Sequence, residues 1–193
     1  MSALAPPTTI ASGRVLADLV PGARVRDAGF VAAFAVLLGL SAQVAVPLPF
    51  TPVPVTGQTF AVLLGAAALG AGRATLGASM YLVLGMIGVP WFTATGGASF
   101  GYIVGFVAAA AVIGWLARRG HDRTVLRTAG LMIVGNLVIY AFGVSGLALY
   151  LGVGLVEATM LGAVPFLAGD AVKLALATAL LPAAWKLVGT DRS

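Results

Sequence analysis

The uncharged stretch from residue 28 to residue 72, AGFVAAFAVLLGLSAQVAVPLPFTPVPVTGQTFAVLLGAAALGAG, decides the fold class. It holds 45 residues without a charged side chain, and Pro47, Pro49, Pro52 and Pro54 lie near its middle. A membrane-spanning helix needs roughly 20 consecutive apolar residues, and prolines interrupt helices. The stretch therefore predicts two membrane-spanning helices joined by a proline-rich turn.

The rest of the chain continues this pattern. Residues 74–117 are also uncharged and are interrupted by Gly88 and Pro90, so they predict a second helical hairpin. Residues 128–156 predict a single helix, and Pro165 marks the start of the last one because proline fits the first helical turn. We therefore predict an all-α integral membrane protein with six transmembrane helices. Their expected ranges are 28–46, 56–72, 74–89, 101–117, 126–151 and 165–187.

The composition excludes several classes of protein. Of the 193 residues, 60% are hydrophobic and only 9% are charged, against about 25% charged in an average soluble domain. Lipid must therefore surround most of the chain, which leaves no room for a separate soluble catalytic domain. The absence of cysteine excludes disulfides and thiolate metal sites. The sequence has no Gly-x-x-x-x-Gly-Lys-Ser/Thr pattern for ATP hydrolysis, and we expect no cofactor, metal or nucleic-acid partner.

The positions of the positive charges predict the orientation in the membrane. Every lysine and arginine except Lys173 falls in the first 27 residues, at Arg73, in the 118–127 segment or at the carboxyl terminus. Six crossings place these segments on one side, and the positive-inside rule makes that side cytoplasmic. We expect a cytoplasmic tail over 1–27, a membrane domain over 28–187 and a cytoplasmic tail over 188–193. The arginines at 118–127 also suit anionic lipid, although orientation alone accounts for them.

Asp170 and Lys173 are the opposite charges that share one apolar helix. Their spacing of three residues places both on one helix face. Charges inside a membrane are costly unless they meet a partner or water, so they are functional candidates. Two interpretations remain open: a ligand site that opens to the outside, or an ion pair that only holds helices together.

Polar and aromatic side chains flank the two loops that we expect on the outer side. Such a mixture suits a small, partly apolar solute, but it also suits an interfacial aromatic belt with ordinary helix caps. The candidates are Gln58 with its neighbours Thr51, Thr56 and Thr59, then Trp91, Phe92, Thr93, Thr95 and Tyr102. In the first helix, small residues stand four apart, as at Ala28 and Ala32 and at Ala35 and Gly39, and they permit close approach by another helix of this protein or of a partner.

Four motifs together resemble the BioY family, the biotin-specific substrate-binding components of energy-coupling factor (ECF) transporters. They are PVPVTGQTF at 52–60, GMIGVPWF at 85–92, GYIVGF at 101–106 and PFLAGDAVK at 165–173. The resemblance implies a six-helix protein of a bacterial or archaeal cytoplasmic membrane that binds biotin from outside. It also implies a transmembrane coupling protein and paired cytoplasmic ATPases as partners.

The resemblance further implies roles for particular residues. Asp170 and Lys173 match the family's binding carboxylate and ammonium, and Ala28 and Ala32 match the face that contacts the coupling protein. The family commonly has a longer loop ending in GPTGGY, where residues 97–102 here read GASFGY, so we assign the loop's polar contact to Thr93 and Thr95. A small intramembrane enzyme and a structural or assembly subunit remain the alternatives. An enzyme would need a second titratable group, and Glu157 is the remaining charge expected on the outer side.

Overall fold

The computed structural model describes residues 13–22, 24–90 and 97–188, and most of these residues are helical. The α-helices are α1 (Arg24–Gln43), α2 (Gln58–Leu69), α3 (Ala71–Met86), α4 (Phe100–Arg118), α5 (Val125–Leu151), α6 (Leu155–Gly162) and α7 (Leu167–Leu187). Short 3-10 helices are η1 (Leu16–Leu19), η3 (Gly97–Ser99) and η4 (Val164–Phe166). Two strands, β1 (Ala45–Leu48) and β2 (Thr51–Thr56), connect α1 to α2.

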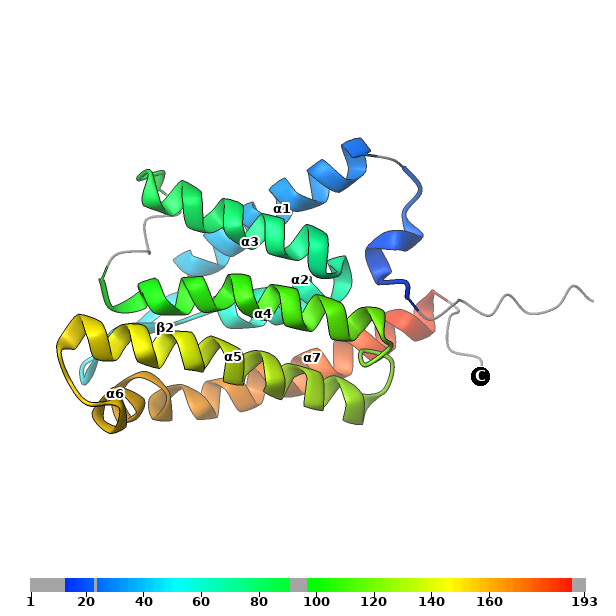
Figure 1. The fold of residues 1–193 in the computed structure, drawn as a ribbon. Coiled ribbons are helices and arrows are strands. Elements are labelled where there is room, and N and C mark those ends of the chain that lie inside the picture. Colours follow the sequence, from blue (N-terminus) through cyan, green and yellow to red (C-terminus); the bar gives the residue numbers. More distant parts are fainter. Residues whose placement is uncertain (1–12, 23, 91–96, 189–193) are drawn as a thin grey trace, which may run out of the picture.

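Helix α4 lies in the middle of the bundle, where it packs against α2, α3 and α5 (Figure 1). Helix α1 packs on α3, and α7 packs on α5 and α2. The beginning of α1, the α4–α5 connection and the end of α7 lie at one end of the bundle, while β2 and α6 lie at the other (Figure 1). The bundle therefore has two distinct ends. We call the end with the start of α1, the α4–α5 connection and the end of α7 the basic end, and the end with β2 and α6 the hairpin end.

Within the described ranges, four helical segments are long and apolar enough to cross a membrane: Arg24–Gln43, Gly97–Arg118, Val125–Leu151 and Leu155–Leu187. Helix α2 is apolar but shorter, with 12 residues. The predicted helix ranges agree with the observed ones to within a few residues, apart from the additional short helix α6. The number of membrane crossings stays a prediction.

The all-α prediction is wrong for the proline-rich segment, which forms an antiparallel hairpin. Ala45 pairs with Thr56 and Val46 with Val55, and the pairing is irregular at Pro47, which has no N–H to donate. Both strands of a two-stranded hairpin are edges, so prolines are tolerated where they would break a central strand. Valine and threonine between the prolines favour extended backbone.

The break between α2 and α3 falls at Gly70, three residues before the expected break at Arg73. Gly70 has φ +80°, a conformation that glycine adopts without strain. Helix α4 crosses this junction closely, because a Cβ atom on Gly114 would lie 2.2 Å from the backbone nitrogen of Ala71. Close packing against α4 therefore fixes the position of the turn.

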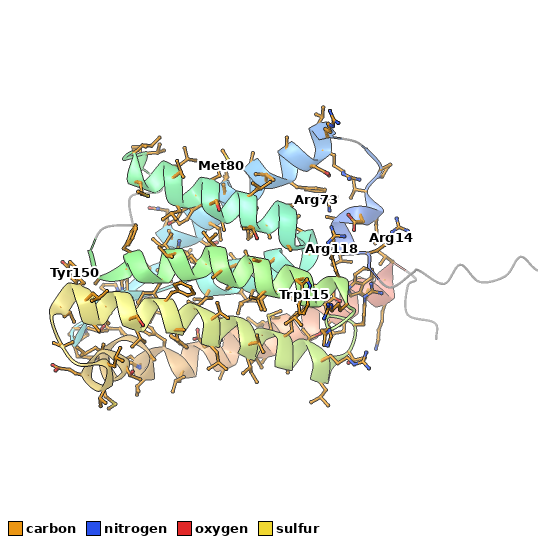
Figure 2. All side chains as sticks on the ribbon, in the orientation of Figure 1. Arg14, Arg73, Met80, Trp115, Arg118 and Tyr150 are labelled. Atoms are coloured by element: carbon orange, nitrogen blue, oxygen red, sulfur yellow. The ribbon has the colours of Figure 1, made fainter. Side chains whose placement is uncertain are left out.

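The segment before α1 lies against the basic end of the bundle. Val15 is fully buried in the core. Asp18 accepts a hydrogen bond from Arg73 Nη1 at 2.6 Å and lies 3.5 Å from Arg118 Nη1. The side chains of Arg73 and Arg118 gather beside η1 (Figure 2). This segment, which we expected as part of a tail, is thus bound to α3 and α4.

A second polar contact fixes the α4–α5 connection to the end of α7. Trp185 Nε1 donates a hydrogen bond to Asp122 Oδ2 at 2.6 Å, and the Arg123 guanidinium lies 3.6 Å above the Trp185 ring. Asp122 is fully buried. Burial raises the pKa of the Asp122 carboxyl, although the contacts with Trp185 and Arg123 act in the opposite direction.

We expect Asp18→Asn to destabilise the protein at neutral pH by about 1 kcal/mol, because solvent screens a partly exposed ion pair. Burial opposes ionisation of Asp18, yet hydrogen bonds from Arg73 and from the Val15 N–H, with the charge of Arg118, hold its pKa below the ordinary 3.8. A lowered folded-state pKa gives stability that is present above 3.8 and is lost as the pH falls through the folded value.

Thermal unfolding in detergent between pH 7 and pH 3 measures this effect. The difference between wild type and Asp18→Asn should shrink as the pH falls. Glu157→Gln is the matched control, because Glu157 is exposed at the hairpin end. An Asp18→Asn variant that unfolds like wild type at pH 7 would contradict the proposed role of Asp18.

Candidate functional site

A cavity of about 470 Å³, including its open mouth, lies between the hairpin, α2, α4, α5 and α7. Its apolar wall comes from Val53, Pro54, Val55, Ile103, Phe106 and Phe166, and its polar groups come from Thr56, Gln58, Thr59, Ser99, Tyr102, Tyr140, Asp170 and Lys173. Most of the surface that faces the cavity is apolar, although eight of the fourteen lining residues carry a polar group.

Asp170 and Lys173 lie together on the wall of this cavity. Lys173 Nζ is 3.3 Å from Asp170 Oδ1 and donates a second hydrogen bond to Thr59 Oγ1 at 2.7 Å. Asp170 is 6% exposed, so its charge depends on these partners. An ammonium group has three donors, and a carboxylate has about four acceptor positions. Both groups therefore retain hydrogen-bonding capacity for a ligand in the cavity.

Tyr140 on α5 is the third partner of this pair, and sequence reasoning missed it. Its hydroxyl donates a hydrogen bond to Asp170 Oδ2. Tyr140 and Asp170 also line a cleft on the other side, between α5 and α7, with Asn136 and Leu137 among its walls. The two side chains thus separate the cavity from the outer surface of the bundle.

Gln58 and Tyr102 line the cavity, but their polar atoms already have partners. Gln58 Nε2 donates to the Tyr81 hydroxyl at 2.8 Å, and the Thr56 hydroxyl donates to Gln58 Oε1 at 3.3 Å. The Tyr102 hydroxyl donates to the carbonyl of Gly162 at 2.6 Å. Tyr102 therefore presents its ring to the cavity and uses its hydroxyl to hold α6.

A sequence profile of the BioY family matches residues 12–190, which is nearly the whole chain. The chain belongs to the BioY family.

Named relatives agree with this match. Biotin transporter BioY from Rhizobium etli is 32% identical over 170 residues, which are 80% of this chain and 90% of that protein. Biotin transporter BioY from Thermotoga maritima is 36% identical over 151 residues, 75% of this chain and 86% of that protein.

A solved structure shares the fold. It is the crystal structure of the S-component for biotin from an ECF-type ABC transporter, with a TM-score of 0.73. The superposition covers 84% of this chain and 92% of that chain, at 18% sequence identity. The chain therefore shares the fold of that S-component.

In this BioY family member, the structure brings six of the predicted candidates to one cavity, whereas Thr51 is not among its lining residues. The six are Thr56, Gln58, Thr59, Tyr102, Asp170 and Lys173. Trp91, Phe92, Thr93 and Thr95 lie outside the described residues, so their roles stay predictions. Other wall residues, such as Phe106, carry no sequence signal that separates them from ordinary helix-packing residues. A tyrosine within an apolar helical segment needs a hydrogen-bond partner, and this is the signal that could have found Tyr140.

The small residues of α1 divide into two groups. Ala35 and Gly39 are buried within the bundle, whereas Ala28 and Ala32 are exposed on its surface. Ala35 and Gly39 therefore contribute to helix packing within this chain. The second pair is accessible to lipid or to another protein, and its contact with a coupling protein stays a prediction.

We expect Tyr140→Phe to lower the stability of the protein by roughly 1 to 3 kcal/mol, because a buried carboxylate oxygen loses its donor. Thermal unfolding in detergent measures the change. Tyr150→Phe is the matched control, since Tyr150 lies on the same helix and is 59% exposed. Equal unfolding temperatures for the two variants would contradict the importance of the Tyr140 hydroxyl.

Proposed function

We propose that this chain is the biotin-binding subunit of an ECF-type vitamin uptake transporter, which captures biotin from the extracytoplasmic side. Membership of the BioY family, the names of its relatives and the S-component fold support the assignment. The observation that carries it within this chain is the Asp170–Lys173 pair on the wall of a mostly apolar cavity.

The cavity suits the chemistry of biotin. Biotin has two ureido N–H donors, a ureido oxygen, an apolar bicycle with a thioether and a carboxylate tail. The Asp170 carboxylate accepts hydrogen bonds from N–H donors, and the Lys173 ammonium binds either the ureido oxygen or the carboxylate. Phe106 and Phe166 provide apolar surface for the bicycle. Among the described residues, charged hydrogen-bonding groups and apolar surface therefore line the same cavity.

The proposed orientation follows from the two ends of the bundle. We place the basic end in the cytoplasm with both termini, and the hairpin end outside, with six crossings between them. Elements of the hairpin end, including β2, η3 and η4, supply part of the cavity wall. In this orientation the cavity is near the outer surface of a multi-pass protein in the cytoplasmic membrane of a bacterium or archaeon.

Transport needs further subunits in this proposal. The sequence contains no P-loop motif, so ATP hydrolysis by that mechanism belongs to partner ATPases. We propose that a transmembrane coupling protein links them to this chain through the exposed Ala28 and Ala32 face of α1. The family is one of transport components, which sets aside the intramembrane enzyme considered from the sequence.

We expect Asp170→Asn and Lys173→Met each to weaken biotin binding by about tenfold or more, because each removes a charged partner of the ligand. The double variant should not bind biotin. If the pair were only structural, each single variant would be strongly destabilised and the apolar double replacement would be tolerated. Calorimetric affinity and unfolding temperature of all three variants separate these cases. A folded double variant with wild-type affinity would rule out this site.

We expect Ala32→Trp to impair assembly with the coupling protein while biotin binding stays intact, because a bulky side chain prevents close helix approach. Co-purification with the coupling protein and the ATPases measures assembly. Leu37→Trp is the control, because Leu37 is also exposed on α1, at 45%, but faces a different direction. Unimpaired assembly of Ala32→Trp would show that this face is not the contact surface.

A further inference from the structure

The carboxylates at the basic end are all engaged by arginines of the same chain, within the part that the structure describes. Asp18 pairs with Arg73 at 2.6 Å. Asp27 pairs with Arg26 at 2.7 Å. Asp122 pairs with Arg123 at 3.4 Å. Each of these arginines thus already has an acidic partner within the chain.

Other cations at the basic end have no acidic partner among the described residues. They are Arg14, Arg24, Arg119, Arg127 and Lys186. Arg14 is held by the backbone carbonyl of Asp18 at 3.1 Å. The bundle therefore carries a positive surplus at the end that we place in the cytoplasm. A negatively charged surface or molecule complements this surplus.

Arg119 differs from the other unpaired cations because an aromatic ring holds it in place. Its guanidinium carbon lies 3.5 Å from the centroid of the Trp115 ring, one helical turn earlier on α4. The Trp115 side chain is 48% exposed, and Figure 2 shows it toward the basic end of α4. Stacking covers one face of the guanidinium and leaves its N–H donors free at the edge.

This pair lies where an apolar helix meets the basic end. Tryptophan at the end of a membrane helix is typical of the membrane–water interface, where lipid headgroups lie. A planar guanidinium binds a phosphate through two parallel hydrogen bonds. Orientation in the membrane requires only positive charge, whereas here one cation also stacks on an exposed aromatic ring.

We propose that Trp115 and Arg119 bind the headgroup of an anionic phospholipid of the cytoplasmic leaflet. The guanidinium binds the lipid phosphate, and the tryptophan ring packs against the glycerol and the upper acyl chains. The unpaired cations around this end raise the local concentration of anionic lipid but do not define the site. This inference is independent of biotin binding.

A titration of the purified protein with phosphatidylglycerol in detergent, followed by native mass spectrometry, tests the proposal. Arg119→Gln should weaken lipid binding by roughly tenfold or more, the effect of losing a charge-assisted hydrogen bond to the phosphate. Trp115→Leu should also weaken binding, because it removes the stacking partner. Arg24→Gln is the matched control, because Arg24 is exposed and has neither an acidic nor an aromatic partner among the described residues. It should lose no more than the general effect of one surface cation, about fivefold. Circular dichroism and size-exclusion chromatography verify folding of each variant.

Several outcomes would overturn the proposal. Wild-type lipid binding by Arg119→Gln would do so, and so would an equal loss in Arg24→Gln, which would indicate a diffuse charge effect. Equal binding of phosphatidylcholine would show that the anionic headgroup is not recognised. Displacement of the lipid by millimolar inorganic phosphate would show that the site recognises a free phosphate instead. Selective phosphatidylglycerol binding that depends on both Trp115 and Arg119 would support the proposal.

Discussion

The structure depends on burying one carboxylate and one ammonium group inside an apolar helical bundle. Either charge alone would cost several kcal/mol in this environment. Asp170 and Lys173 avoid that cost by pairing with each other. In addition, Asp170 accepts a hydrogen bond from the Tyr140 hydroxyl, and Lys173 donates one to the Thr59 hydroxyl. These partners come from α5 and α2, while the pair itself is on α7. The polar network that prepares the cavity for a ligand therefore also fixes three helices relative to one another.

The two ends of the bundle have different roles: polar contacts connect chain segments at the basic end, and the hairpin end forms part of the cavity wall. At the basic end, Asp18 joins the segment before α1 to α3 and α4, and Trp185 joins the end of α7 to the α4–α5 connection through Asp122. At the hairpin end, β2 and the short helices close around the cavity, and Tyr102 holds α6 through the Gly162 carbonyl. The contacts at the basic end keep the helices in place, and the hairpin end can therefore contain a cavity.

Much of the fold and the central charge pair could be predicted because both depend on local sequence features. Uncharged stretches locate helices, and the spacing of Asp170 and Lys173 places them on one face. The hairpin is not predicted because prolines suggest a turn, whereas the valine and threonine residues beside these prolines favour strands, which tolerate proline at an edge. Tyr140 was missed because its contact with Asp170 depends on how α5 and α7 align, which no local pattern encodes. The same holds for the turn at Gly70, which is set by the close approach of Gly114.

The most direct test of the central claim is a calorimetric titration of the purified wild-type protein with biotin, after analysis of the sample for biotin that co-purifies. The account predicts saturable binding of one biotin per chain with high affinity, or bound biotin already present in the preparation. A folded protein that holds no biotin and produces no binding heat at any tested temperature would contradict it, and the Asp170–Lys173 pair would then be a structural feature of the bundle.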